Sequence, residues 1–423
     1  MKKFFLTIRK YGVIGLVLKF IKKITYRLFR FFDRLDNKHD KYLIKKGKIE
    51  QSYRNLEKIC SKKKYKQIYI FYPYSEWDLP VFQRPQQIAL SLSKRNDVLY
   101  LFCTANYIDN IDGLYKKIND NLYVVTDYEF VNNLKLKNKI LHLYSTDITS
   151  DYSVVEKALN NGEQVLYEYI DEIHEDITMS APDFYLKKHQ KILKNEKCSV
   201  VVTADKLKED LLKYRKKNYA LSTNGVNVED FIPTIEEVDE RIKDIQKKYD
   251  KIVCYYGSLA VWFDYKLLIK AAKKYPNYAF LLIGIEYDNS MKKSGVSKLD
   301  NIIYLGKIPY KELINITKDI DLFTIPFVIN EITESTSPVK LFEYMATQKP
   351  ILTTNMKECR KYKSVIIGKD HTDYINKIES TIKLNGNKEY MELELKEANE
   401  NTWDSKANII VELIENNMKV NKK

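Results

Sequence analysis

The stretch Ser337-Pro338-Val339-Lys340-Leu341-Phe342-Glu343-Tyr344-Met345-Ala346 is the most informative part of the sequence. A serine followed by a proline is typical of a helix start, because serine caps the first amides and proline fits the first turn. A helix N-terminus presents unpaired N–H groups to an anion, and Lys340 would add a full positive charge there. The stretch therefore predicts a helix that binds an anion such as a diphosphate. The alternative is an ordinary capped helix whose Lys340 and Glu343 face solvent.

Apolar runs alternate with helical segments on both sides of this stretch. The first set of runs covers residues 67–72, 98–102, 122–125, 140–143, 164–169 and 200–203, and the second covers 252–257, 280–284, 302–305, 322–326 and 350–354. This alternation predicts parallel sheets of the doubly wound α/β kind. A polar connection over 233–250 separates the two sets, and 423 residues exceed what one core holds. We expect two Rossmann-like domains that face a cleft.

The composition is that of a globular protein, with 44% hydrophobic residues and 33 tyrosines. The formal charge of +14 is concentrated before residue 70, although a coding bias towards lysine would have a similar effect. The five cysteines are widely spaced and form no Cys-x-x-Cys pair, which indicates neither a disulfide framework nor a zinc site and fits a reducing cytoplasm. Nucleic-acid binding is not expected, because no recognisable binding motif accompanies the charge.

The first 35 residues form a basic amphipathic pattern. Read as a helix, Phe20, Ile24 and Leu28 share one stripe, while Lys23 and Arg27 share another. The apolar run is too short to span a bilayer, and no small-residue cleavage site follows it. We expect residues 1–35 to bind an anionic membrane surface. The other interpretation is that the apolar stripe packs on the protein's own domain.

Together with Lys349-Pro350-Ile351-Leu352, the stretch 337–346 resembles the group 1 family of retaining GT-B glycosyltransferases, and the resemblance extends over most of 67–415. It implies a nucleotide-sugar donor whose diphosphate lies at Ser337, Pro338, Val339 and Lys340 and whose ribose is held by Glu343. One departure stands out. The family usually has a second glutamate, in contact with the transferred sugar, where this chain has Ser335.

Three further segments resemble parts of the family, two of them donor-binding segments and the third the turn between the domains. Gly257 and Ser258 follow a strand and resemble its glycine loop, but Trp262-Phe263-Asp264 stands where an arginine and a lysine are common, so Lys266 is the nearest cation. The turn Gly306-Lys307-Ile308 is similar to the turn that meets the donor base through its main chain, and the alternative is a plain strand-to-helix turn. Asn224-Gly225 resembles the interdomain turn, where glycine permits a positive φ.

The N-terminal half supplies the expected catalytic groups. Arg84, in Arg84-Pro85-Gln86-Gln87, could face the diphosphate or only pair with a surface carboxylate. Asp171 and Glu172 follow a strand, and acidic groups gathered at such an end are site candidates. In the resembling branch, an acidic pair faces the reacting sugar or the acceptor. His174 could carry a proton or be structural. Lys340 and Arg84 would stabilise the departing diphosphate electrostatically.

No metal or other cofactor is expected, because Asp319-Ile320-Asp321 precedes its strand at the amino end, away from the cleft. We expect a helical extension over 1–50, an acceptor-side domain over 51–230, a nucleotide-sugar domain over 231–400, and a helix over 401–423 that crosses back, anchored by Trp403. The resemblance implies a hexosyltransferase with a lipid-linked or polysaccharide acceptor, active in cell-surface glycan synthesis at the cytoplasmic face of the membrane. The alternatives are a noncatalytic nucleotide- or glycan-binding partner and a GT-B sugar-nucleotide epimerase.

Overall fold

The computed structural model describes residues 48–62, 65–79, 82–173, 182–233 and 235–420. The predicted membrane-binding segment over 1–35, and His174, lie outside these ranges. The chain divides into two compact units, one of residues 1–64 and 111–116 and one of residues 65–110 and 117–423. Helix α2 (Lys48–Lys62) belongs to the first unit. Every helix in the described ranges is too short or too polar to cross a bilayer.

The first sheet has eight strands in the order β3-β4-β2-β1-β5-β6-β7-β8. Its strands are β1 (Gln67–Phe71), β2 (Val98–Cys103), β3 (Tyr115–Asn119), β4 (Leu122–Val125), β5 (Lys139–Tyr144), β6 (Gln164–Tyr169), β7 (Ser199–Val202) and β8 (Tyr219–Leu221). The pairings from β4 to β8 are parallel, as in Gln67 opposite Val98. Its helices are α3 (Arg84–Ser93), α4 (Tyr128–Asn133), α5 (Ser153–Asn160), α7 (Asp183–Lys194) and α8 (Asp205–Leu211). The inner strands are buried along their length, which explains their continuous apolar sequences.

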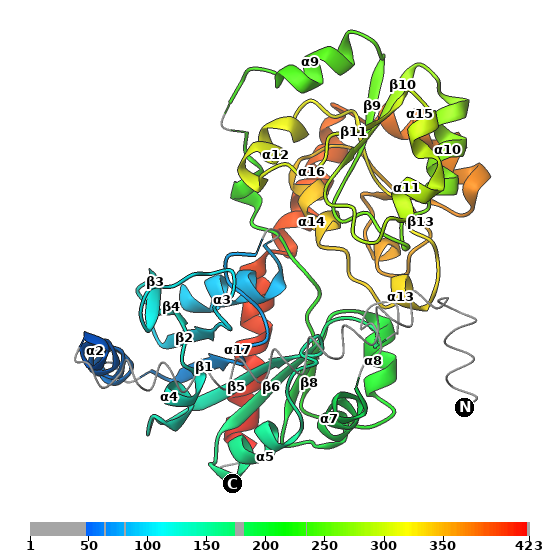
Figure 1. Cartoon of the computed structure of the whole chain (residues 1–423). Helices are drawn as coiled ribbons and strands as arrows, with labels where there is room; N and C mark the ends of the chain where they lie inside the picture. The colour runs from blue at the N-terminus through cyan, green and yellow to red at the C-terminus, as the bar shows by residue number, and fades with distance from the viewer. Residues whose placement is uncertain (1–47, 63–64, 80–81, 174–181, 234, 421–423) are drawn as a thin grey trace, which may run out of the picture. The chain divides into compact units, whose positions relative to one another are not determined.

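The second sheet is parallel throughout, in the order β11-β10-β9-β12-β13-β14. Its strands are β9 (Lys251–Tyr256), β10 (Tyr278–Ile283), β11 (Ile302–Tyr304), β12 (Leu322–Ile325), β13 (Ile351–Thr354) and β14 (Val365–Gly368). The helices are α9 (Glu240–Gln246), α10 (Tyr265–Lys274), α11 (Ser290–Ser294), α12 (Tyr310–Thr317), α13 (Glu331–Glu334), α14 (Val339–Ala346), α15 (His371–Ile382) and α16 (Lys388–Glu400), and short 3₁₀ turns cover Val228–Phe231, Val296–Lys298 and Cys359–Lys361 (Figure 1). The predicted doubly wound α/β architecture is confirmed.

Each sheet has a central strand at which its strand order reverses. In the first sheet β1 lies between β2 and β5, and in the second β9 lies between β10 and β12. The connections leave these central strands towards opposite faces, so a crevice opens beyond their carboxyl ends. The residues that follow β9 and β12 are therefore placed to meet a ligand.

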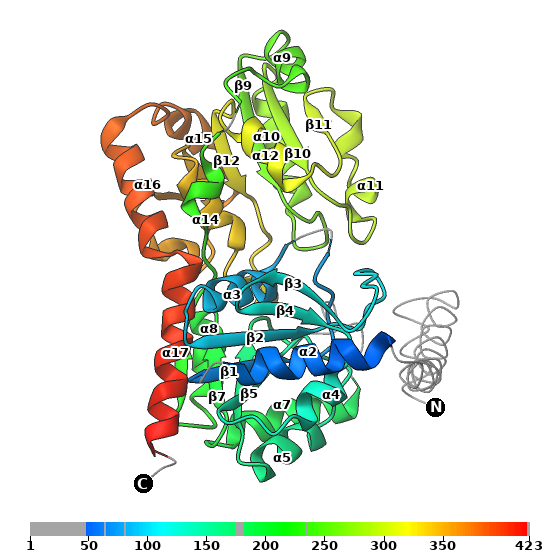
Figure 2. The same ribbon diagram turned by 90° about the vertical axis from the view of Figure 1, so that its left-hand side faces the viewer.

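The chain passes between the two sheets twice, and the two passages lie side by side. The amide of Val226 donates to the carbonyl of Asn401 at 3.0 Å, and the amide of Trp403 donates to the carbonyl of Val226 at 3.1 Å. A side chain on Gly225 would place its Cβ 2.8 Å from the carbonyl oxygen of Asn401, so only glycine permits this approach. Helix α17 (Trp403–Val420) then packs on the first sheet against α3 and β6–β8 (Figure 2).

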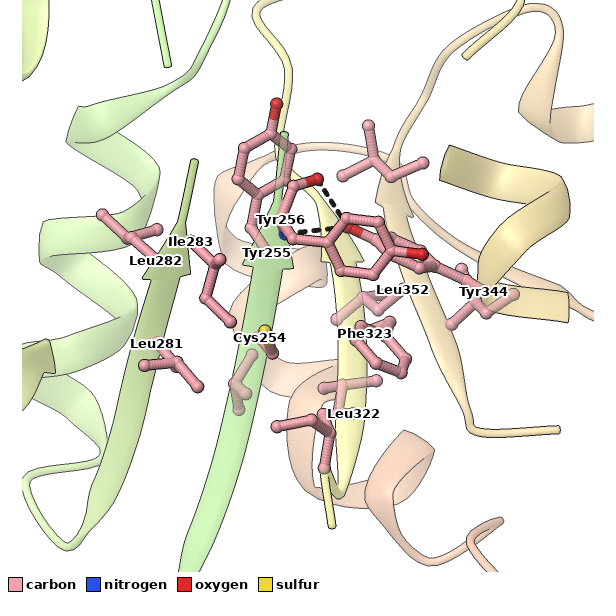
Figure 3. Close-up of a cluster of buried hydrophobic side chains, with 14 of the residues drawn as sticks. Cys254, Tyr255, Tyr256, Leu281, Leu282, Ile283, Leu322, Phe323, Tyr344 and Leu352 are labelled. Carbon is pink, nitrogen blue, oxygen red and sulfur yellow. Dashed lines mark hydrogen bonds between the residues drawn. The ribbon is translucent and has the colours of Figure 1, made fainter. Parts of the chain in front are cut away.

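Helix α14 is fixed to the second sheet through Tyr344. Its ring stacks on Phe323 of β12 with the centroids 4.4 Å apart. The Tyr344 hydroxyl accepts from the amide of Tyr256 at 3.1 Å and donates to the carbonyl of the same residue at 3.3 Å (Figure 3). An aromatic pair of this kind contributes about 1 kcal/mol beyond its buried area. The helix is thus held at the end of β9, directly beside Gly257.

Candidate functional site

A cavity of about 500 Å³ lies where the carboxyl ends of both sheets meet. Its walls are largely apolar with a few convergent charged groups, which is the usual composition of a small-molecule site. The predicted site residues that line it are Arg84, Asp171, Gly257, Ser258, Lys307, Ile308, Ser337, Pro338, Val339, Lys340 and Glu343. The structure therefore brings together groups from five separate segments.

Three predicted site residues stand outside the cavity wall. Lys266 is exposed on α10, so the cation nearest to Ser258 in the sequence is not part of the lining. Gly306 contributes its carbonyl, which accepts from the amide of Gly284 at 2.8 Å. Glu172 follows the cavity residue Asp171, and its carboxylate accepts from the Ser335 hydroxyl at 2.8 Å.

The N-terminus of α14 faces this cavity. Ser337 was expected to cap the helix, but the structure places Pro338 at the N-cap and gives the helix no side-chain cap. The Ser337 hydroxyl instead accepts from the amide of Asn224 at 3.3 Å. The amide of Leu341 donates to the carbonyl of Pro338 at 3.1 Å. Because the N-cap makes no side-chain hydrogen bond, the first amides of the helix remain available to an anion in the cavity.

Lys340 lies in the first turn of α14 and is partly buried. Its ammonium nitrogen is 5.5 Å from the ring centre of Tyr255 and 5.2 Å from that of Phe327, which are favourable cation–π distances. Burial lowers the pKa of Lys340 to about 8, although the nearby carboxylate of Glu343 acts in the opposite direction. A Cβ at Gly257 would stand 2.5 Å from the Lys340 side chain, so glycine makes the room for it.

Glu343 lies one turn after Lys340 on the same face of the helix. Burial raises the pKa of its carboxyl to about 7, and the positive charge of Lys340 opposes that rise. A charged carboxylate in such a place gains from hydrogen-bond donors, which ligand hydroxyl groups provide. The pair can thus hold an anion at one end and a polyol at the other.

Gly284 is a cavity residue that the sequence analysis placed in a strand but not in the site. Its φ is +143°, and a Cβ there would lie 1.8 Å from the carbonyl oxygen of Gly257. The amide of Gly257 also donates to the carbonyl of Ile283 at 2.8 Å. The two glycines let the ends of β9 and β10 approach each other beneath the cavity floor. A glycine directly after each of two apolar runs was the available signal.

Asp171 brings a carboxyl group to the cavity from the end of β6. Removal from water raises its pKa to about 7, so this group exchanges protons near neutral pH. Glu172 is turned to Ser335, which is fully buried. The contact fixes the end of β6 beside the segment that leads into α14. Asp171 and Glu172 therefore have different environments despite being neighbours in sequence.

Arg84 does not pair with a surface carboxylate, as one interpretation of the sequence had it. Its Nε donates to Glu168 Oε2 at 2.5 Å, and these side chains are 3% and 0% exposed. One Nη donates to the carbonyl of Thr223 at 2.9 Å. Most of the guanidinium is thus engaged inside the protein, although part of Arg84 still lines the cavity.

Glu168 is the centre of a buried network that the sequence analysis missed. Its second oxygen meets His142 Nε2 at 2.9 Å and accepts from the Tyr144 hydroxyl at 2.7 Å. Burial alone would raise the pKa of Glu168, but the charge of Arg84 and these hydrogen bonds outweigh it and hold the pKa at about 2. A glutamate inside a buried strand run was the signal, because such a charge is rarely buried without a partner.

Of the other positions considered in the sequence, Trp262 lies at the cavity and Asp321 lies away from it. Trp262 is half-buried and lines the cavity, with its ring centre 6.2 Å from that of Tyr287. Asp321 stands at the amino end of β12, where its carboxylate meets Lys251 at 3.0 Å and accepts from the amide of Ile252 at 2.9 Å. Within the described ranges, no cluster of three or more metal-binding side chains occurs.

Solved structures resemble both sheets of the chain. Sucrose-phosphate synthase from Thermosynechococcus elongatus has a TM-score of 0.61 at 14% identity, covering 84% of this chain and 99% of that one. HepE of Anabaena, solved in complex with UDP, has a TM-score of 0.56 at 10% identity, covering 83% and 100%. The fold is GT-B. In this GT-B chain the cavity lies between the two doubly wound sheets.

The second sheet also matches a known sequence family. Residues 236–394 match the family described as "Glycosyl transferases group 1", and this region contains α14. The putative teichuronic acid biosynthesis glycosyltransferase TuaH of Bacillus subtilis strain 168 is 27% identical over 187 residues, which is 43% of this chain and 47% of TuaH. The match thus spans about half the length of that relative.

Proposed function

We propose that this GT-B chain is a glycosyltransferase that moves a hexose-type sugar from a nucleotide-diphosphate donor to a lipid-linked or polysaccharide acceptor, with retention of configuration. The observation that carries the proposal is the uncapped N-terminus of α14, which faces the cavity with Lys340 and Glu343 in its first two turns. The group 1 match over residues 236–394 supports it. So do TuaH, named as a glycosyltransferase, and HepE, solved with UDP.

In the proposed reaction the donor diphosphate lies at the first amides of α14 and beside Lys340. The positive charge of Lys340 and the helix N-terminus stabilise the diphosphate as it leaves, so these groups rather than a metal ion provide the electrostatic assistance. Glu343 accepts hydrogen bonds from the ribose hydroxyls. The main chain of Lys307 and Ile308 lies on the same cavity wall and meets the base.

The acceptor side belongs to Asp171, at the end of β6. The departing phosphate takes the acceptor proton in a retaining transfer, so Asp171 chiefly stabilises the oxocarbenium-like sugar by its charge. Because the pKa of Asp171 is about 7, that charge is present above neutral pH and is lost below it. Glu172, held by Ser335, keeps the end of β6 in place.

A donor panel tests this function. UDP, GDP, ADP and dTDP are tested separately for an increase in the melting temperature, and the sugar conjugates of the best base are then incubated with a lipid-extracted acceptor. We expect the nucleotide of one base to raise the melting temperature, and the enzyme to consume the sugar conjugate of that nucleotide. NMR should show that an α-linked donor gives an α-linked product. Tight nucleotide binding without turnover would favour the noncatalytic interpretation, and acceptor-independent conversion of the donor sugar would favour an epimerase.

Glu343→Gln tests the placement of the donor. The variant keeps the shape of the side chain but loses a charge-assisted hydrogen bond worth about 1.5–3 kcal/mol, so nucleotide affinity should fall about ten- to hundredfold. Glu379→Gln is the matched control, since Glu379 lies on the exposed face of α15 and pairs only at the surface with Lys383. Equal affinities for the Glu343 variant and the wild type would show that the donor lies elsewhere.

We further propose that residues 1–35 hold the enzyme at the inner face of the membrane. The full chain and a chain without residues 1–35 are sedimented with vesicles of phosphatidylglycerol or of phosphatidylcholine. Only the full chain should bind, only to the anionic vesicles, and less at high salt, because the attraction between exposed charges is screened. Binding by the shortened chain would contradict the assignment.

A further inference from the structure

Asn224 connects the passage between the two sheets to the start of α14. Its side-chain Nδ2 donates to the carbonyl of Ser337 at 2.6 Å, and its main-chain amide donates to the Ser337 hydroxyl at 3.3 Å. Ser337 directly precedes Pro338, the N-cap of the helix. The residue that leads into the proposed donor-binding helix is therefore held twice by one asparagine that is 113 positions away in the sequence.

Arg84 holds Asn224 from the other side. One Nη of Arg84 reaches both the carbonyl of Thr223 at 2.9 Å and the side-chain oxygen of Asn224 at 3.4 Å. The other Nη reaches the hydroxyl of Ser222 at 3.4 Å. The planar guanidinium can serve these acceptors together with Glu168 because its donors point in fixed directions. Glu168 itself is fully buried in the first sheet.

These contacts fix which way the Asn224 amide points. Its oxygen faces the donors of Arg84, and its nitrogen faces the carbonyl of Ser337. Turning the amide over would set donor against donor and acceptor against acceptor. A continuous line of hydrogen bonds thus runs from the buried carboxylate of Glu168 through Arg84 and Asn224 to Ser337, the residue before the N-cap of α14.

We propose that Asn224 is a positioning residue for the donor site, and that Arg84 acts on the donor through Asn224 rather than by touching it. The inference rests on the proposed function, because it takes α14 as the donor-binding helix. The N-terminus of that helix must be placed accurately, since an error of about 1 Å in a reacting geometry can cost about a hundredfold in rate. Asn224 is well suited to this task because it joins a buried ion pair to Ser337, the residue that leads into the helix.

The test compares Asn224→Ala, Arg84→Lys and the double variant with the wild type. Asn227→Ala is the matched control, since the side-chain amide of Asn227 donates to Gln87 and to Asp230 at 3.2 Å each, rather than to Ser337. Arg84→Lys keeps a positive charge near Glu168 but lacks the fork that reaches Thr223 and Asn224. Two quantities are measured for each: hydrogen–deuterium exchange at residues 337–343 without ligand, and the Kd of the nucleoside diphosphate that the wild type binds best among UDP, GDP, ADP and dTDP.

We expect Asn224→Ala to speed exchange in the first turn of α14 severalfold and to weaken nucleotide binding about five- to tenfold, the usual effect of one lost hydrogen bond. Arg84→Lys should do the same, and the double variant should be no worse than the more affected single variant. The control should change neither quantity. The effects of Asn224→Ala and Arg84→Lys should therefore not add, because Arg84 acts on the helix through Asn224.

Two results would overturn the inference. One result has two parts: Arg84→Lys loses nucleotide affinity while hydrogen–deuterium exchange at α14 stays unchanged, and the fold-losses of affinity of the two single variants multiply in the double variant. Together these would mean that Arg84 contacts the ligand directly. The other is unchanged exchange in Asn224→Ala. If the wild type binds none of the four nucleotides, the proposed function fails, while the exchange measurement still decides whether Asn224 positions α14. If Arg84→Lys does not fold, Asn224→Ala alone decides.

Discussion

Replacing Lys340 by methionine should make the nucleotide-free protein more stable and the nucleotide complex weaker. In the folded protein burial lowers the pKa of Lys340 from 10.5 to about 8. At roughly 1.4 kcal/mol for each pKa unit, this difference corresponds to about 3 kcal/mol of destabilisation while the side chain is charged. Methionine has a similar length and can retain the packing on Tyr255 and Phe327, although it loses the cation–π attraction. The expected gain in the free energy of unfolding is therefore between about 1 and 3 kcal/mol.

The stabilising effect of Lys340→Met should depend on pH, because Lys340 loses its proton at a lower pH in the folded state than in the unfolded state. Below about pH 8 Lys340 is charged in both the folded and the unfolded state, so the full cost of burying the charge is present. Between about pH 8 and 10.5 the folded state releases the proton first, and the stability of the wild type rises with pH. The advantage of Lys340→Met should thus be complete at pH 7 and should shrink as the pH rises above 8.

Urea unfolding at pH 7 and pH 9.5, with and without nucleotide, measures both effects. Lys266→Met is the control, because Lys266 is exposed on helix α10 and does not line the cavity. Nucleotide affinity should fall about ten- to hundredfold in Lys340→Met at pH 7, as expected for a lost charge-assisted contact. A Lys340→Met protein that is less stable than the wild type at pH 7, or that binds nucleotide equally well, would contradict this role of the buried charge.

Three further outcomes are expected. Gly284→Ala should lower the free energy of unfolding in urea by several kcal/mol, because its Cβ would stand 1.8 Å from a main-chain oxygen. The control Gly386→Ala, which would have nothing within 4 Å of its Cβ, should lower it by about 1 kcal/mol through its positive φ alone. Equal losses in the two variants would contradict this steric argument. Asp171→Asn is compared with its parent in a Glu343→Gln background, because the pKa of the Glu343 carboxyl is also about 7. The rise of turnover with pH through about 7 should disappear in the Asp171 variant, because the carboxyl gains its charge there, and a profile that keeps its inflection would rule out this role. Ser335→Ala removes the hydrogen bond to Glu172, so the free energy of unfolding should fall by about 1 kcal/mol and donor turnover less than tenfold, and an unchanged protein would show that the contact holds nothing in place.

The sequence predicted the architecture well because buried parallel strands need continuous apolar runs. Three strands of the structure were not predicted, because their apolar runs are short or interrupted by charged residues. β3 (Tyr115–Asn119) carries two exposed lysines, β8 (Tyr219–Leu221) has three residues, and β14 (Val365–Gly368) is partly exposed. Strands at or near the edge of a sheet do not require the apolar pattern by which central strands are recognised.

The candidate site was predictable where neighbouring residues act together and unpredictable where distant ones do. Lys340 and Glu343 lie three positions apart on one helix, so their spacing alone brings them to one face. The roles of Ser337 and Arg84 were different. Their partners Asn224 and Glu168 are 113 and 84 positions away, and local sequence carries no information about such pairing.

The packing of α17 has a consequence for the order in which the protein can be completed during synthesis. Trp403 is 1% exposed, and its helix lies on β6–β8, strands that are made some two hundred residues earlier. The side of β6–β8 that α17 covers therefore stays uncovered until the whole second sheet has been translated. A fragment cut after the first passage should expose that apolar side and aggregate, whereas adding residues 401–420 as a separate peptide should cover it.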